Sequence, residues 1–233
     1  MIGMDQNQTS PTRLVTITGL IISCFLLFVF PAFIVTFFKS ILLLTFKLRL
    51  LISISFVWLS LALIYIYSYK VEKLNFLIWE EVNYPVNQFL KLVLQTLLIC
   101  FASSIVIGVV LKMTGFKMDN DKATQLVKFL KSNQLLLFLI PVSAAVTEEL
   151  IFRGYLQSRL QLLFKNKYIP IIISSLLFGL AHLGYGTAKQ IIGTFFIGLV
   201  FSIHYNKYRS IKILIICHFL WDYLIFQLFM HMK

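Results

Sequence analysis

Long apolar runs alternate with short polar and basic stretches along most of the chain. A membrane-spanning helix needs about 20 consecutive apolar residues, and the runs reach or approach this length. The pattern therefore predicts about seven spanning helices, within a range of six to eight. We expect them at residues 14–38, 50–69, 89–111, 135–164, 168–183, 190–205 and 211–230.

The stretches between these runs carry most of the Lys and Arg residues. We interpret residues 70–88 as a loop, with an interfacial helix as an alternative, and expect a surface helix within the charged stretch 112–134. The first run is longer than the apolar core of a signal peptide, which has about 7 to 15 residues, so we interpret it as a retained anchor. Gly193 and Gly198 in the sixth run are small enough to allow close packing between helices.

The composition narrows the class of protein. Hydrophobic residues make up 59% of the chain and charged residues 13%, whereas about a quarter of a soluble domain is charged. We therefore expect an all-α, polytopic transmembrane helix bundle, integral to the lipid bilayer and multi-pass. A net charge of +12 does not indicate nucleic acid, because the basic residues flank apolar runs and form no basic stripe with interleaved aromatic residues.

Three cysteines, Cys24, Cys100 and Cys217, lie inside apolar runs and far apart in the sequence. Their spacing matches neither a disulfide framework nor a CxxC metal or redox site. We interpret them as small core residues.

Acidic residues are rare, and their distribution indicates a buried site. Of nine, Glu148, Glu149 and Asp222 lie inside apolar runs, and we expect the others in the connecting stretches. An ionisable side chain at membrane depth is costly and normally marks a functional position. The pair at 148 and 149 is therefore the first candidate for chemistry.

Glu149 and Arg153 are four residues apart, so on a helix they share one face and can form a charge-assisted pair. Glu148 is turned by about 100° from its neighbour. A purely structural ion-pair cluster would account for all three residues, but one Arg does not compensate two carboxylates in a low dielectric. Glu148 is therefore a candidate general base.

Two histidines lie in the later apolar runs. A single buried His such as His182 is more often a hydrogen-bonded core residue than a catalyst. His218 and Asp222 are four residues apart on one predicted helix, so Asp222 can fix the tautomer of His218. Taken together, these acids and histidines on three apolar helices indicate a catalytic site rather than structure alone.

Two mechanisms fit these residues. In the first, Glu148, His182 and His218 hold a divalent metal such as zinc, with an open position for water. In the second, Glu148 and His182 activate water directly, without a metal, and His218 with its neighbour stabilises the oxyanion. Both give peptide-bond hydrolysis in or beside the membrane, and the residues alone do not separate them. The HExxH motif of common zinc proteases is absent.

Three segments resemble the motifs of a known family. EELIFRG at 148–154, FGLAH at 178–182 and HFLWD at 218–222 are similar to the EExxxR, FxxxH and HxxxN/D motifs of the CAAX protease and bacteriocin-processing (CPBP or Abi) family. That family comprises intramembrane endopeptidases and is similar to the type II CAAX prenyl endopeptidases. The resemblance covers about residues 135–230. We therefore expect a catalytic core at 135–233 and N-terminal transmembrane helices with amphipathic connections at 1–134, within one bundle.

The resemblance implies roles for the residues of the first two motifs. Glu148 would be the base that activates water. His182 would help to activate or position that water. Glu149 and Arg153 would support them.

The third motif contains a departure from the family pattern. The resemblance places His218 and Asp222 at the oxyanion or at a metal, but many members carry Asn where this chain has Asp222. An ionised Asp cannot donate a hydrogen bond to an oxyanion, so this residue would be protonated or would instead orient His218.

The substrate that the resemblance implies is a membrane-associated peptide or protein, such as a CAAX-type, bacteriocin or signal-peptide-like chain. Abundant Lys, Ile and Phe with little Ala indicate a low-GC bacterial or archaeal genome and hence a prokaryotic cell membrane. One alternative is a non-catalytic membrane protein for bacteriocin self-immunity or partner binding, although complete motifs argue against it. Another is a transporter that relays protons through Glu148 and Asp222, but the chain shows no internal repeat.

Overall fold

The secondary structure is entirely helical in the part of the chain that the structure, a computed structural model, describes: residues 11–31, 45–115, 121–131, 133–185 and 187–231. Several helices continue directly into π or 3₁₀ turns, labelled η. In chain order the elements are α1 (Arg13–Cys24), η1 (Phe25–Val29), α3 (Phe46–Tyr67), η2 (Ser68–Glu72), α4 (Val86–Met113), α5 (Asp121–Lys131), α6 (Gln134–Glu149), η3 (Leu150–Gln157), α7 (Ser158–Leu163), α8 (Tyr168–Ala181), η4 (His182–Tyr185), α9 (Ala188–Tyr208) and α10 (Ile211–His231).

The helices have the lengths that membrane crossing requires. Five segments are long and apolar enough to span: Phe46–Glu72, Val86–Met113, Gln134–Leu163, Ala188–Tyr208 and Ile211–Met230. Two shorter apolar segments are Arg13–Val29 and Tyr168–Gly184. Each segment corresponds to one predicted run, which confirms a multi-pass transmembrane helix bundle. The helix expected within 112–134 is α5.

The second predicted helix, formed by α3 and η2, is longer than predicted. It continues through η2 to Glu72, because the first residue that leaves the helical conformation is Lys73, whose positive φ of 54° ends the helix. Residues 73–85 contain no helix, so the loop predicted at 70–88 is present but shorter at both ends, and it contains no interfacial helix. The end of the first predicted helix, residues 32–38, lies outside the described residues.

Threonine side chains begin three of the helices. Thr12, Thr45 and Thr187 each accept a hydrogen bond from the backbone N–H three residues further on, at 3.3–3.4 Å. These bonds satisfy donors that have no partner within the helix. At the other end of α9, Arg209 adopts a positive φ of 53° and terminates the helix.

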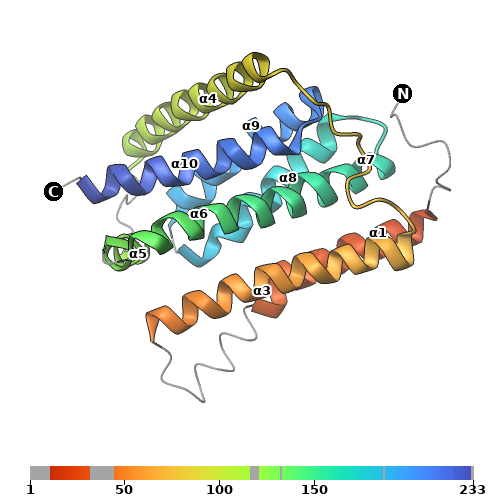
Figure 1. The fold of residues 1–233 in the computed structure, drawn as a ribbon, viewed down its shortest axis with the longest axis horizontal. Coiled ribbons are helices and arrows are strands. Elements are labelled where there is room, and N and C mark those ends of the chain that lie inside the picture. The colour runs from red at the N-terminus through yellow and green to blue at the C-terminus, as the bar shows by residue number, and fades with distance from the viewer. Residues whose placement is uncertain (1–10, 32–44, 116–120, 132, 186, 232–233) are drawn as a thin grey trace.

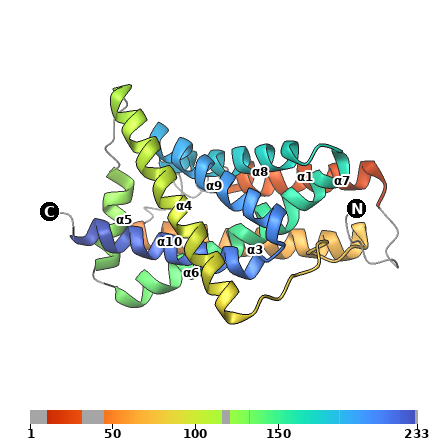
Figure 2. The same cartoon turned by 90° about the horizontal axis from the view of Figure 1, so that it is seen from above.

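The helices lie roughly side by side, with α1 and α3 along one side of the bundle and α4 along the other (Figure 1). Between them α8 packs against α9, and α10 packs against α6. Figure 2 shows α4 crossing α9 and α10 obliquely. One apolar cluster joins α4, α9 and α10, a second joins α1, α3, η3 and α8, and Leu150 contacts both. The acidic pair that precedes Leu150 therefore lies at the centre of the bundle.

The loop at 73–85 crosses one end of the bundle and is anchored there. Leu74, Ile78 and Trp79 bury their side chains among the helices. The carboxylate of Glu81 accepts hydrogen bonds from Ile211 N (2.9 Å) and from Ser210 Oγ (2.7 Å). Because Glu81 binds the first backbone N–H of α10, it acts as a cap supplied by a distant part of the chain.

Candidate active site

The helix that begins as α6 changes from α to π geometry directly after Glu149. The π segment η3 has eight residues, and η3 and α7 together carry the helix on to Leu163. π-helical turns are rare and frequently occur at functional sites. Nearly every side chain of η3 is buried, and Ser174 Oγ on α8 donates to the carbonyl of Phe152 at 2.8 Å. This irregular segment is therefore held by its neighbours.

The predicted pair of Glu149 and Arg153 is confirmed. Arg153 Nη1 lies 2.8 Å from Glu149 Oε1, and both side chains are fully buried. Arg153 Nη2 also donates to the carbonyl of Gly198 on α9 at 3.2 Å. The guanidinium lies over the ring of Phe178 on α8, 4.3 Å from its centre. Three elements thus fix the position of this cation.

Close packing at Gly198 makes this contact possible. A Cβ atom at Gly198 would lie 3.0 Å from Phe178 Cδ1 and 3.3 Å from Arg153 Nη2. Any larger residue would therefore press on the guanidinium or on the ring beside it. At Gly193, on the same helix, a Cβ would meet nothing within 4 Å. The prediction of close packing is confirmed for Gly198 and wrong for Gly193, because only Gly198 faces α8.

His218 of α10 is oriented by Glu149. Its Nδ1 lies 2.7 Å from Glu149 Oε1, and because a carboxylate accepts, Nδ1 carries the proton. The other nitrogen, Nε2, lies 3.6 Å from Asp222 Oδ2 and 4.0 Å from Glu148 Oε2. Each ring nitrogen thus has a carboxylate as its neighbour, and the expectation that Asp222 fixes the tautomer stays a prediction. Glu149 lies on the Nδ1 side of the ring and Asp222 on the Nε2 side.

Glu148 differs from Glu149 in both access and partners. Its side chain is 25% exposed, whereas that of Glu149 is fully buried. Both glutamates have an Oε2 that accepts no hydrogen bond from any described residue, but Oε1 of Glu149 accepts from Arg153 and His218. The carboxylate of Glu148 interacts electrostatically with His182, His218 and Asp222. Of the two glutamates, only Glu148 is thus able to meet a substrate or a water molecule.

His182 lies at the end of α8, near Glu148. It is the first residue of η4, and its Nδ1 donates to the carbonyl of Phe178 at 2.9 Å. The ring of Phe178 contacts both histidines. Its centre lies 5.0 Å from the centre of the His182 ring and 5.9 Å from that of the His218 ring. The residues predicted from all three motifs therefore meet in one cluster.

A second buried ion pair was not predicted. Arg159 is fully buried and lies 3.0 Å from Glu72 Oε2. Arg159 also donates to Ser68 Oγ and to Phe76 O, both at 2.6 Å, and Tyr155 Oη donates to Glu72 Oε1 at 2.9 Å. The sequence did contain a signal, since an Arg within an apolar spanning run requires a partner. The expectation that Glu72 lies in a connecting stretch is wrong, because η2 carries it into the bundle.

The residues of the cluster do not form a ready metal site. Within the described ranges, no group of three or more His, Cys, Asp and Glu side chains is placed so that it could hold a metal ion. This includes the candidate set of Glu148, His182 and His218. The mechanism considered below therefore uses only the side chains of the chain itself.

Comparison with known proteins finds a family match for the later part of the chain. Residues 131–224 match the family model described as type II CAAX prenyl endopeptidase Rce1-like. No curated protein and no solved structure matches the chain. The expected division of the bundle at residue 135 stays a prediction.

The matched stretch begins at the last residue of α5, ends within α10 and contains every predicted site residue. Its three motifs meet in a cluster of acids and histidines inside a membrane-spanning bundle. Residues 131–224 are thus similar to the Rce1-like type II CAAX prenyl endopeptidases.

Proposed function

We propose that this protein hydrolyses a peptide bond in a membrane-associated, CAAX-type peptide or protein, with Glu148 as the base that activates water. The observation that supports this most strongly is the setting of Glu148. It is partly exposed and lies beside His182, His218 and Asp222. A general base must be accessible and close to a group that stabilises developing charge, and Glu148 meets both conditions.

In the proposed reaction, Glu148 removes a proton from a water molecule as the water oxygen attacks the carbonyl carbon of the scissile bond. His182 positions that water from the end of α8. The carbonyl oxygen becomes an oxyanion near Nε2 of His218. In this step His218 acts as an imidazolium between the carboxylates of Glu149 and Asp222, so that its Nε2–H donates to the oxyanion. When the C–N bond breaks, Glu148 returns the proton to the amine that leaves, so the carboxylate is regenerated.

The other three residues support His218. Glu149 holds the ring through Nδ1, and Arg153 holds Glu149. Asp222 contacts Nε2 at 3.6 Å, and an ionised carboxylate has no proton to donate. We therefore assign Asp222 to positioning the ring of His218 and assign the contact with the oxyanion to His218 itself.

The test uses purified protein in liposomes and a fluorogenic peptide with an S-farnesylated cysteine, three further residues and a free carboxyl end. Wild type is expected to release one product, and mass spectrometry in H₂¹⁸O should place one heavy oxygen in the new carboxylate. Liposomes without protein and Glu148→Gln are the controls. Wild type that releases no product beyond these controls would contradict the proposed activity.

A parallel arm with a metal chelator tests the metal-free route. Activity that persists after chelation is expected, because the described side chains offer no group of metal ligands. Activity that is lost with chelator and restored by added zinc would instead show that a metal ion is required. Glu148, His182 and His218 would then be its ligands, brought together by metal binding.

A further inference from the structure

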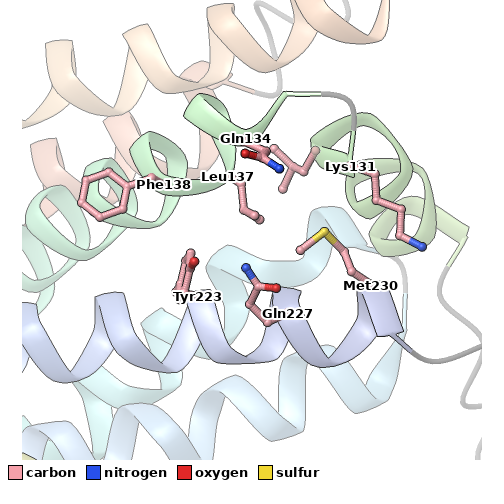
Figure 3. Close-up of a pocket in the computed structure, with 8 residues that line it drawn as sticks. Lys131, Gln134, Leu137, Phe138, Tyr223, Gln227 and Met230 are labelled. Atoms are coloured by element: carbon pink, nitrogen blue, oxygen red, sulfur yellow. The ribbon is translucent and has the colours of Figure 1, made fainter.

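A pocket lies beside the candidate active site, at the end of the bundle where α6 begins and α10 ends. Its volume is about 500 Å³, within the range typical of ligand sites. It is lined by residues of α5, α6 and α10: Leu130, Lys131, Gln134, Leu137, Phe138, Tyr223, Gln227 and Met230. Figure 3 shows Gln134 and Leu137 on α6 opposite Tyr223, Gln227 and Met230 on α10.

The pocket adjoins the site along both helices. Tyr223 directly follows Asp222, and Gln227 lies about 6 Å beyond Tyr223 along α10 at 1.5 Å per residue. On α6, Leu137 lies about 16 Å from Glu148 by the same measure. A peptide that enters the bundle from the end at which α6 begins therefore reaches the pocket before it reaches Glu148.

The neutral polar groups of the pocket have no hydrogen-bond partner among the residues that the structure describes. Neither the amide of Gln134 or Gln227 nor the hydroxyl of Tyr223 forms a hydrogen bond with any described residue. In Figure 3 the ammonium of Lys131 points away from the opposed glutamines. The groups that face the interior are thus neutral, and each amide both donates and accepts hydrogen bonds.

This combination matches the backbone of an extended peptide, which presents one N–H and one C=O per residue. Leu137, Phe138 and Met230 supply apolar surface for the peptide's side chains. We propose that the pocket holds an extended segment of the substrate peptide while its scissile bond lies at Glu148, a proposal that rests on the proposed function. At about 3.3 Å per residue, the segment lies roughly two to six residues from the bond.

The test measures binding and cleavage for peptides of different length. The parent is the farnesylated peptide described above. One series adds up to six alanine and serine residues before the cysteine, and the other adds them after the third residue. Gln134→Leu and Gln227→Leu remove the polar groups at similar size. Gln95→Leu, which replaces an exposed glutamine of α4 outside the pocket, is the matched control.

The effect of a pocket variant on KM is expected to depend on the length of the peptide. In one series, peptides long enough to reach the pocket should show a KM raised several-fold by Gln227→Leu with unchanged kcat, whereas the parent should show no change. Gln95→Leu should leave all values unchanged. An equal effect of Gln227→Leu on long and short peptides, or no effect in either series, would overturn the proposal.

Binding measured in the Glu148→Gln background separates this proposal from the proposed function. Fluorescence anisotropy of labelled peptides gives dissociation constants without cleavage. A length-dependent weakening by Gln227→Leu in that background supports the pocket even if no hydrolysis is found. Cleavage by wild type without length-dependent binding contradicts the pocket and leaves the proposed function in place.

Discussion

Glu148 and Glu149 are adjacent in the sequence but differ in their surroundings. Glu149 is fully buried, and one of its oxygens receives both Arg153 and His218. Glu148 is partly exposed, and Nε2 of His218 lies 4.0 Å from its Oε2. The sequence predicted the Glu149 pair from its spacing of four. It did not predict which carboxylate orients His218, because helical spacing does not show which groups of a second helix lie opposite.

The charge of Glu149 is expected to matter for stability as well as activity. Glu149→Gln keeps the shape but leaves the buried cation of Arg153 without a carboxylate, which should cost about 3–5 kcal/mol. Thermal unfolding in detergent should show a lower Tm, while Glu80→Gln, at an exposed acid, serves as control. The double variant Glu149→Gln/Arg153→Met should recover much of the lost Tm but should not recover kcat. A single variant as stable and active as wild type would contradict the assigned role.

Asp222 is expected to tolerate replacement by asparagine. Asp222→Asn keeps a polar oxygen beside His218 Nε2 and adds a donor, so kcat should remain of the same order as in wild type. Asp222→Leu removes the polar contact of this residue with Nε2 of the ring and should lower kcat roughly tenfold or more. Peptide cleavage by the two variants checks this. Loss of activity in Asp222→Asn would show that the negative charge itself is required.

At the scale of elements, α9 supplies the support that the motifs do not contain. The carbonyl of Gly198 holds Arg153, and the missing side chain of this glycine lets α9 approach Phe178. The three motifs lie on α6, η3, α8, η4 and α10, so sequence reasoning placed no functional residue on α9. The close packing of Gly198 was predictable from its size, but its contact with Arg153 was not, because it joins residues far apart in the chain.

Two glycines of α9 provide a matched test of this contact. Gly198→Ala should displace Arg153 or Phe178, and a small displacement at a catalytic site can lower kcat by about 10- to 100-fold. Gly193→Ala should change kcat little, since its new methyl group meets no atom within 4 Å. Both variants make the same chemical change in one helix. Equal kcat values for the two would contradict the positioning role of Gly198.

At the scale of the whole molecule, the pair of Glu72 and Arg159 joins the second helix and the following loop to the fourth helix. Arg159 donates to Glu72 and to the carbonyls of Asn75 and Phe76. The spanning helices were predictable because hydropathy is a local property of each run. The contact between Glu72 and Arg159 was not predictable, because Glu72 follows the apolar run and only the added turn of η2 brings it to Arg159.

Removing one member of this pair is expected to destabilise the fold without affecting the chemistry directly. Glu72→Gln should lower the free energy of unfolding by about 3–5 kcal/mol, because Arg159 stays buried without its partner. Chemical denaturation in detergent measures the loss, with Glu80→Gln as control. The kcat of the folded fraction should be unchanged. A destabilisation no larger than that of the control would show that the pair contributes little.

The central claim is that Glu148 activates water for peptide hydrolysis, and its most direct test is the kcat of Glu148→Gln on the farnesylated peptide in liposomes. Glutamine keeps the size of the side chain but cannot accept the proton, so kcat should fall by about 10²- to 10⁴-fold. Thermal unfolding should show that the variant is folded, and Glu80→Gln should retain the wild-type rate. A folded Glu148→Gln protein that cleaves the peptide at the wild-type rate would contradict the account.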